Sequence, residues 1–213
     1  MNLPNKITLT RICMIPVFVA VFYCGFLSPW CFLASAIVFV LAAATDALDG
    51  HIARSRHLVT DLGKFLDPIA DKVLVSTALI VLLTVPVAFT VSPFGSYGLI
   101  VAGVCVALIL ARELIVSGFR MIAAGKNLVL AADKLGKFKT TFQDAAIALL
   151  LASMPLLLLS NGATDHGMYV AGLVIDYIGL ACFAICTVLT VVSGINYIVK
   201  NKQVLKSSEE SGQ

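Results

Sequence analysis

Long apolar stretches separated by short polar ones run along almost the whole chain. Each is close to the ~20 residues that a helix needs to cross a bilayer. The pattern predicts an all-α integral membrane protein with six membrane-spanning helices, over residues 7–26, 30–48, 65–89, 97–119, 140–159 and 168–199. Because polar residues open the first stretch, we expect an N-terminal segment that lies along the membrane interface. Residues 1–200 would form one domain, and residues 201–213 a polar tail.

Composition supports a membrane location. The chain is 60% hydrophobic and only 13% charged, with a mean hydropathy of +1.00. Soluble domains have about 45–50% apolar and about 25% charged residues, so a soluble fold is excluded. We therefore expect membrane lipids, and no nucleic acid, around this protein. The six cysteines lie in or beside apolar stretches without a CxxC pair, which indicates small buried hydrophobic residues.

The basic residues predict the orientation. They fall at the two termini and in the loops after the second and fourth predicted helices, whereas the other loops have none. Since cytoplasmic loops are rich in Lys and Arg, both termini should be cytoplasmic, as an even number of spans requires. The cations that carry this signal are Arg54, Arg56, Lys64, Lys126, Lys134, Lys200, Lys202 and Lys206.

Four aspartates stand out at the end of the second predicted helix and the start of the third. Asp46 and Asp49 are three residues apart, and Asp67 and Asp71 are four apart, so each pair shares a helix face. If the two helices turn back on each other, the four carboxylates can converge. Converging carboxylates need positive charge among them, and hard oxygen ligands favour Mg²⁺ or Mn²⁺. Two such ions, as in two-metal phosphoryl-transfer sites, fit this set.

Structural explanations exist for single members of this cluster. Asp67 before Pro68 is a good N-cap, and Asp71 could pair with Lys72 or Arg54. Gly50 and Gly63 suit either the close approach of a pyrophosphate or close packing of helices. The phased arrangement of four aspartates favours the metal site over these alternatives.

The full motif is Asp46-x2-Asp49-Gly50-x2-Ala53-Arg54-x8-Gly63-x3-Asp67-x3-Asp71. It resembles the signature of the CDP-alcohol phosphatidyltransferase family at every fixed position. The resemblance implies a six-helix membrane fold, usually a homodimer, with a site open to the cytoplasm. It implies that Asp46, Asp49 and Asp67 ligate two divalent metals, and that Asp71 is both a ligand and the general base. Residues implied to line the CDP pocket are Gly50, Ala53, Arg54 and Gly63.

A second polar region follows the fourth predicted helix. Glu113, Ser117 and Arg120 share one helical stripe, and Lys137 begins a similar stripe before the fifth helix. Such stripes inside a membrane helix are costly unless they face a polar cavity, and their donors suit a phosphomonoester. The alternative is that these cations only set the orientation of the helices in the membrane. Beyond Asp144 the chain reads as apolar helix, and Asp176 is left without an assigned role.

These stretches and the N-terminal segment resemble the branch of the family whose acceptor is glycerol 3-phosphate. By that resemblance, Asn5, Thr8 and Arg11 approach the headgroup of the donor, CDP-diacylglycerol. The residues implied to hold the acceptor phosphate are Arg112, Ser117, Arg120, Lys137 and Lys139.

The expected reaction transfers a phosphatidyl group from CDP-diacylglycerol to glycerol 3-phosphate, in the cytoplasmic membrane of a bacterium. Inositol phosphate or phosphatidylglycerol remains an alternative acceptor. A divalent-cation transporter would also place carboxylates in membrane helices, but nearer the bilayer midplane. A purely structural membrane subunit would not need four phased aspartates.

Overall fold

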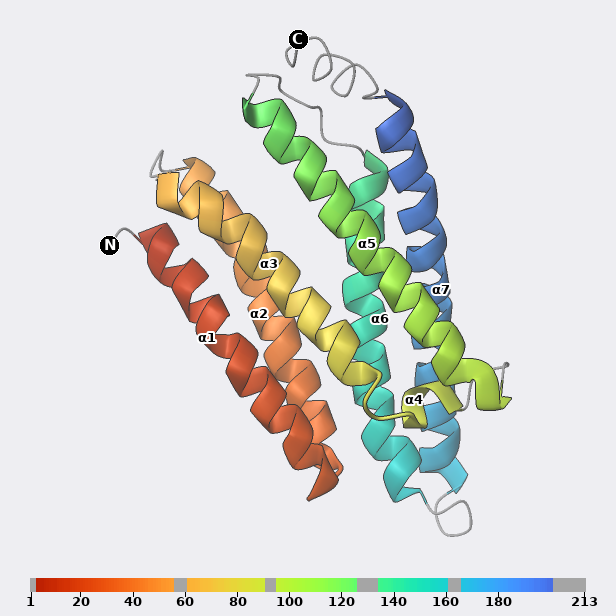
Figure 1. The fold of residues 1–213 in the computed structure, drawn as a ribbon. Coiled ribbons are helices and arrows are strands. Elements are labelled where there is room, and N and C mark those ends of the chain that lie inside the picture. Colours follow the sequence, from red (N-terminus) through yellow and green to blue (C-terminus); the bar gives the residue numbers. More distant parts are fainter. Residues whose placement is uncertain (1–2, 56–60, 91–94, 126–133, 161–165, 201–213) are drawn as a thin grey trace.

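The computed structural model describes residues 3–55, 61–90, 95–125, 134–160 and 166–200, and every regular element in these ranges is helical (Figure 1). The long helices are α1 (Leu3–Tyr23), α2 (Trp30–Ser55), α3 (Asp61–Leu82), α5 (Gly98–Gly125), α6 (Lys134–Leu159) and α7 (His166–Lys200). Three short elements connect them: η1 (Cys24–Phe26), α4 (Val87–Thr90) and η2 (Gly95–Tyr97). The predicted all-α class is confirmed for this part of the chain.

Each long helix lies where the apolar pattern predicted one. Four helical stretches are long and apolar enough to cross a membrane: Leu9–Phe26, Gly98–Phe119, Phe138–Leu159 and His166–Tyr197. The apolar runs of α2 and α3 within the described residues are shorter, at Trp30–Thr45 and Lys72–Leu82. The chain is therefore a helical protein with several candidate membrane spans, and the count of six stays a prediction.

The third predicted helix was wrong at its C-terminal end. It was expected to run to residue 89, but α3 ends at Leu82 and α4 is separate. Pro86 disfavours helical geometry in the residue before it. The last amides accordingly bond three residues back, as between the Val85 amide and the Leu82 carbonyl at 3.3 Å. The Thr84 hydroxyl also donates to the Val81 carbonyl at 2.7 Å, which helps close the helix.

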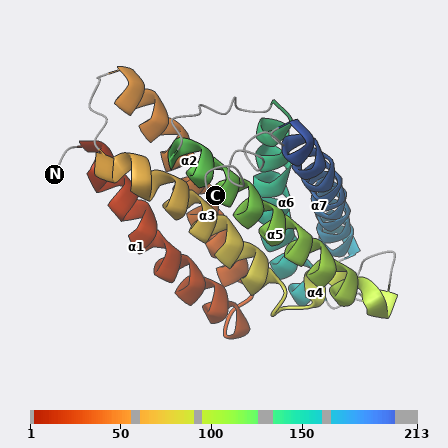
Figure 2. The ribbon, with the colours of Figure 1, turned by 45° about the horizontal axis from the view of Figure 1, so that its top comes forward.

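Helix α6 lies at the centre of the bundle. It packs against α2 and α3 on one side and along nearly the whole of α7 on another (Figure 1). Helix α1 packs against α2 and α3, and Figure 2 shows α5 lying between α3 and α7. Helices α1, α3 and α6 begin, and α2, α5 and α7 end, at one end of the bundle, which we call the terminal end (Figure 1). The helix ends that carry the motif therefore meet there.

Aromatic packing joins α1 to α2. The rings of Phe22 and Phe32 meet edge to face with centroids 5.1 Å apart, and Phe18 and Phe39 extend the cluster. The turn between the helices needs Gly25, because an added Cβ there would lie 2.4 Å from the Phe32 ring. Close approach at Gly25 thus lets the two helices pack tightly from the turn onward.

Large apolar side chains also cover the outside of the bundle. Leu114 and Met121 on α5 are each 73% exposed, and Ile195 on α7 is 61% exposed. Contiguous apolar surface of this kind is rare on soluble proteins. Surrounding lipid would cover it, which agrees with the hydropathy of the helices.

A buried polar contact joins α6 to α7 within their apolar stretches. The Ser153 hydroxyl donates to Oδ1 of Asp176 at 2.9 Å, and both side chains are fully buried. Gly172 and Gly179 bring the helices close, since a Cβ at Gly172 would lie 2.9 Å from the Cβ of Leu156. Small residues are typical of such close helix contacts in membranes.

Candidate functional site

The aspartate motif spans two neighbouring helices. Asp46 and Asp49 lie in the C-terminal part of α2, and Asp67 and Asp71 lie in the first three turns of α3. Because α2 ends and α3 begins at the terminal end, the backbone brings the two pairs to the same end of the bundle (Figure 1). Their side chains lie outside the described residues, so convergence of the carboxylates stays a prediction.

The predicted donor residues are distributed over three helices. Gly50, Ala53 and Arg54 lie in α2, and Gly63 lies in α3. The side chains of these residues lie outside the described part of the chain, as do those of Asn5 and Thr8 in α1. Arg11 is described and is only 1% exposed. Its guanidinium is therefore turned into the bundle, where α1 packs against α2 and α3.

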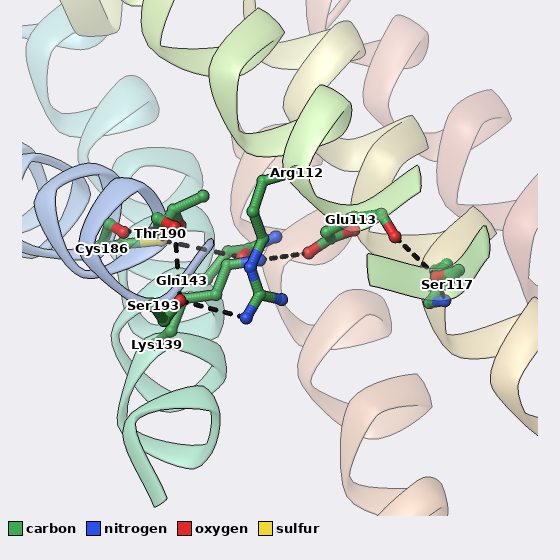
Figure 3. Close-up of polar contacts among 9 residues, drawn as sticks. Arg112, Glu113, Ser117, Lys139, Gln143, Cys186, Thr190 and Ser193 are labelled. Carbon is green, nitrogen blue, oxygen red and sulfur yellow. Dashed lines mark hydrogen bonds and ion pairs between the residues drawn. The ribbon is translucent and has the colours of Figure 1, made fainter. Parts of the chain in front are cut away.

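An ion pair joins α5 to α6 inside the bundle. The Lys139 ammonium lies 2.5 Å from Oε1 of Glu113, and the two side chains are 1% and 13% exposed (Figure 3). Burial of a lysine is costly without a partner, and Glu113 supplies the opposite charge. The structure thus brings together residues from the two polar stretches that the sequence predicted to face one cavity.

Arg112 extends this polar region toward α7. Its Nη2 donates to the Ser193 hydroxyl at 3.0 Å (Figure 3). Gly194 makes room for the arginine stem, because a Cβ there would lie 3.0 Å from Arg112 Cγ. The guanidinium is therefore fixed by α7, a helix that the sequence left without a role.

Ser117 links α5 to the helix that carries Asp71. Its hydroxyl donates to the Glu113 carbonyl at 2.5 Å, and it accepts a hydrogen bond from the Lys72 ammonium on α3. Lys72 follows Asp71 directly in the chain. The predicted acceptor residues on α5 and the predicted base on α3 are consequently on helices in direct contact.

Two other predicted acceptor residues are placed only by their helices. Arg120 lies in the last part of α5, and Lys137 in the first turn of α6. Because α5 ends and α6 begins at the terminal end, both positions lie toward that end of the bundle (Figure 1). The side chains of Arg120 and Lys137 lie outside the described residues.

Sequence reasoning missed a polar face on α7 and its partners. The Cys186 thiol donates to Oε1 of Gln143 at 3.7 Å, and Thr190 lies one turn further along α7 (Figure 3). Thr187, Thr190 and Ser193 recur every three residues, which places them on one helix face. The three-residue spacing of these hydroxyl side chains is the feature of the sequence that could have predicted this polar face.

This arrangement suits the binding of an anion. Arg112 and Lys139 are brought together beside Glu113, which pairs with Lys139 (Figure 3). Guanidinium and ammonium groups removed from water bind phosphate more strongly than they would at an exposed surface. Among the described residues, no group of three or more His, Cys, Asp and Glu side chains could hold a metal. The side chains of the four motif aspartates lie outside these residues.

Comparison with known proteins agrees with the motif. The sequence model of the CDP-alcohol phosphatidyltransferase family matches residues 1–192. A Bacillus subtilis protein named CDP-diacylglycerol–glycerol-3-phosphate 3-phosphatidyltransferase is 41% identical over 97% of this chain and 98% of its own length. A Rickettsia bellii protein of the same name is 37% identical over 92% of this chain and 93% of its own length.

A relative with another name covers less of both chains. The CMP-forming cardiolipin synthase of Oryza sativa is 38% identical over 72% of this chain and 46% of its own length. The family match extends through α1 to most of α7. With the complete Asp46–Asp71 motif on α2 and α3, these matches show that the chain belongs to the CDP-alcohol phosphatidyltransferase family.

Proposed function

We propose that this chain transfers the phosphatidyl group of CDP-diacylglycerol to glycerol 3-phosphate, giving phosphatidylglycerophosphate and CMP. The observation that carries the proposal is the near full-length identity to the Bacillus subtilis protein named for this reaction. The polar contacts of Arg112 and Lys139 give the proposal a physical basis, because a phosphomonoester needs such donors.

Two divalent cations, Mg²⁺ or Mn²⁺, would be held by Asp46, Asp49, Asp67 and Asp71. The backbone supports this fit, because it places both pairs at the terminal end on helices joined by a short connection. The donor set consists of carboxylate oxygens, which is the chemistry that these ions prefer. When bound, the ions would neutralise charge on the pyrophosphate and on the transferred phosphoryl group.

The residues of the chain would bind and orient the two substrates and would deprotonate the acceptor. Asp71 would take the proton of the acceptor hydroxyl as that oxygen attacks the phosphorus bearing diacylglycerol. Gly50, Ala53, Arg54 and Gly63 would line the CDP pocket on α2 and α3. Asn5, Thr8 and Arg11 would approach the same headgroup from α1, in agreement with the inward position of Arg11.

Acceptor recognition would belong to α5 and α6. The acceptor residues would be Arg112, Ser117, Arg120, Lys137 and Lys139, and they would hold the phosphate of glycerol 3-phosphate. Glu113 supplies an opposite charge beside the buried Lys139 ammonium. The acceptor hydroxyl would then point toward α3, which contacts α5 through Lys72 and Ser117.

The whole chain would span the cytoplasmic membrane of a bacterium six times as a homodimer. An N-terminal interfacial segment would precede the first span, and residues 1–200 would form one domain with 201–213 as a polar tail. Both termini and the site would face the cytoplasm. The helices support this topology, since α1 begins and α7 ends at the same end of the bundle (Figure 1). The lipid donor would enter between helices, and the water-soluble acceptor would arrive from the cytoplasm.

One assay tests the function. Purified protein is given labelled CDP-diacylglycerol with glycerol 3-phosphate, glycerol, inositol phosphate or phosphatidylglycerol as acceptor. We expect release of CMP and formation of phosphatidylglycerophosphate with glycerol 3-phosphate, and very little transfer to glycerol. Preferred transfer to phosphatidylglycerol would indicate a cardiolipin synthase instead. Equal use of glycerol and glycerol 3-phosphate would contradict recognition of the acceptor phosphate.

A further inference from the structure

The Ser117 hydroxyl has already used its proton in this structure. A serine hydroxyl has one hydrogen to donate and two lone pairs that can accept. The Ser117 hydrogen goes to the Glu113 carbonyl, 2.5 Å away on the preceding turn of α5. In this arrangement Ser117 has no second hydrogen with which to bind a phosphate oxygen.

Lys72 supplies a different donor at the same point. Its ammonium donates to the Ser117 oxygen, and its side chain is half-buried between α3 and α5. Lys72 also brings a positive charge to the place where α5 faces α3, and anion recognition requires such a charge.

We infer that Lys72 is a phosphate-binding residue of the acceptor subsite, and that Ser117 is a positioning residue that holds the Lys72 ammonium there. The inference rests on the proposed function, because it deepens the recognition of glycerol 3-phosphate. It moves the direct contact from a hydroxyl on α5 to a cation on α3. The acceptor phosphate would thus be held partly by the helix that carries Asp71, which fixes the distance between the phosphate and the base.

A double-mutant cycle tests the inference. Lys72→Met removes the charge and keeps the length of the side chain, so the acceptor KM should rise roughly 10- to 150-fold, as for loss of one charge-assisted contact. The donor KM should stay unchanged, and transfer to glycerol, which has no phosphate, should be unaffected. Lys72→Arg should retain most of the affinity for the acceptor. Ser117→Ala should raise the acceptor KM less than Lys72→Met does.

The acceptor KM of the double variant decides whether Ser117 acts only through Lys72. If Ser117 acts only through Lys72, Lys72→Met with Ser117→Ala should have the same acceptor KM as Lys72→Met alone. Ser76→Ala on α3 and Lys200→Met at the end of α7 are matched controls and should change neither KM. If Lys72→Met does not fold, as judged by gel filtration and donor KM, Lys72→Gln provides the same comparison.

Several results would overturn the inference. If the rise in acceptor KM of the double variant equals the product of the rises in the two single variants, Ser117 binds phosphate by itself. An equal rise in donor KM would place Lys72 with the donor, and an unchanged acceptor KM would remove it from the site. Loss of glycerol transfer in parallel with glycerol 3-phosphate transfer would indicate a structural role. The wild-type acceptor panel is measured separately, so failure of the proposed function is recognised before any variant is compared.

Discussion

Each of the four motif aspartates carries a charge that a membrane disfavours, by about 2.5–3.5 kcal/mol at the centre of a helix. If divalent cations compensate these charges, Asp46→Asn should lower kcat/KM about 10²–10³-fold, the usual cost of losing one electrostatic contact to a transition state. Excess EDTA should abolish transfer by the wild type, and added Mg²⁺ or Mn²⁺ should restore it. The measurement is CMP release with purified protein.

Asp61→Asn is the matched control for this prediction. Asp61 begins α3 and lies outside the motif, so its loss should leave kcat/KM close to that of the wild type. Full turnover in excess EDTA would contradict the two-metal proposal. An effect of Asp61→Asn as large as that of Asp46→Asn would show that the loss reflects general surface charge.

The sequence identified the types of residue in the site, but not their partners. Spacing along one helix placed Glu113 and Ser117 on a common face, and the structure joins them through the Ser117 hydroxyl and the Glu113 carbonyl. The pair between Glu113 and Lys139 spans 26 residues and two helices. Such a pair depends on how α5 and α6 are rotated against each other, and no spacing within one helix determines that rotation. The contact between Lys72 and Ser117 depends in the same way on how α3 and α5 lie against each other.

Among the helices, α7 has a role in the site that its sequence did not indicate, because it contacts Arg112. Gly194 makes room for the Arg112 stem, so Gly194→Val should push that side chain away from Ser193. We expect a higher acceptor KM with an unchanged donor KM, and a loss of about 1–3 kcal/mol in stability from overpacking. Thermal unfolding in detergent and steady-state kinetics measure the two effects.

Gly103→Val on α5 is the control for this substitution. Apart from its chain neighbours and the backbone of α5, no heavy atom of the described residues lies within 4 Å of a Cβ added at Gly103, so we expect valine to be accommodated there. Equal changes in acceptor KM for the two valine variants would contradict a specific role for the contact between Gly194 and Arg112.

Helix boundaries were predicted well where composition changed sharply and poorly where a single residue decided them. The stretch from α3 to α4 is apolar throughout, so hydropathy alone merged the two helices. Pro86 ends the regular helix four residues before its own position, a local backbone effect that an average over apolar residues conceals.

At the scale of the whole molecule, the proposed topology predicts opposite exposure of two positions. In a chain without its native cysteines, Tyr97→Cys should react with a membrane-impermeant maleimide added to intact cells. Tyr97 is 70% exposed beside the start of α5, at the end of the bundle opposite the termini. Lys200→Cys, at the end of α7, should react only after the membrane is broken.

Reaction of Lys200→Cys in intact cells would contradict cytoplasmic termini. Reaction of both positions from the outside would mean that the labelled cells are leaky, and a cytosolic protein with an exposed cysteine serves as the control for that case. The charge pattern predicted this orientation because the cations gather at the termini and in two loops. It could not predict the central place of α6, which depends on packing among helices of similar hydropathy.

The buried contact between Asp176 and Ser153 has a consequence for the depth of α7. Helix α7 is apolar over 32 residues, enough to cross a bilayer although it carries one carboxyl group in its first third. The Ser153 hydroxyl donates to that carboxyl, and both side chains are fully buried, so the carboxyl is turned away from lipid. A shift of α7 along α6 by one turn would separate the two groups. The pair therefore favours one depth of α7 against α6.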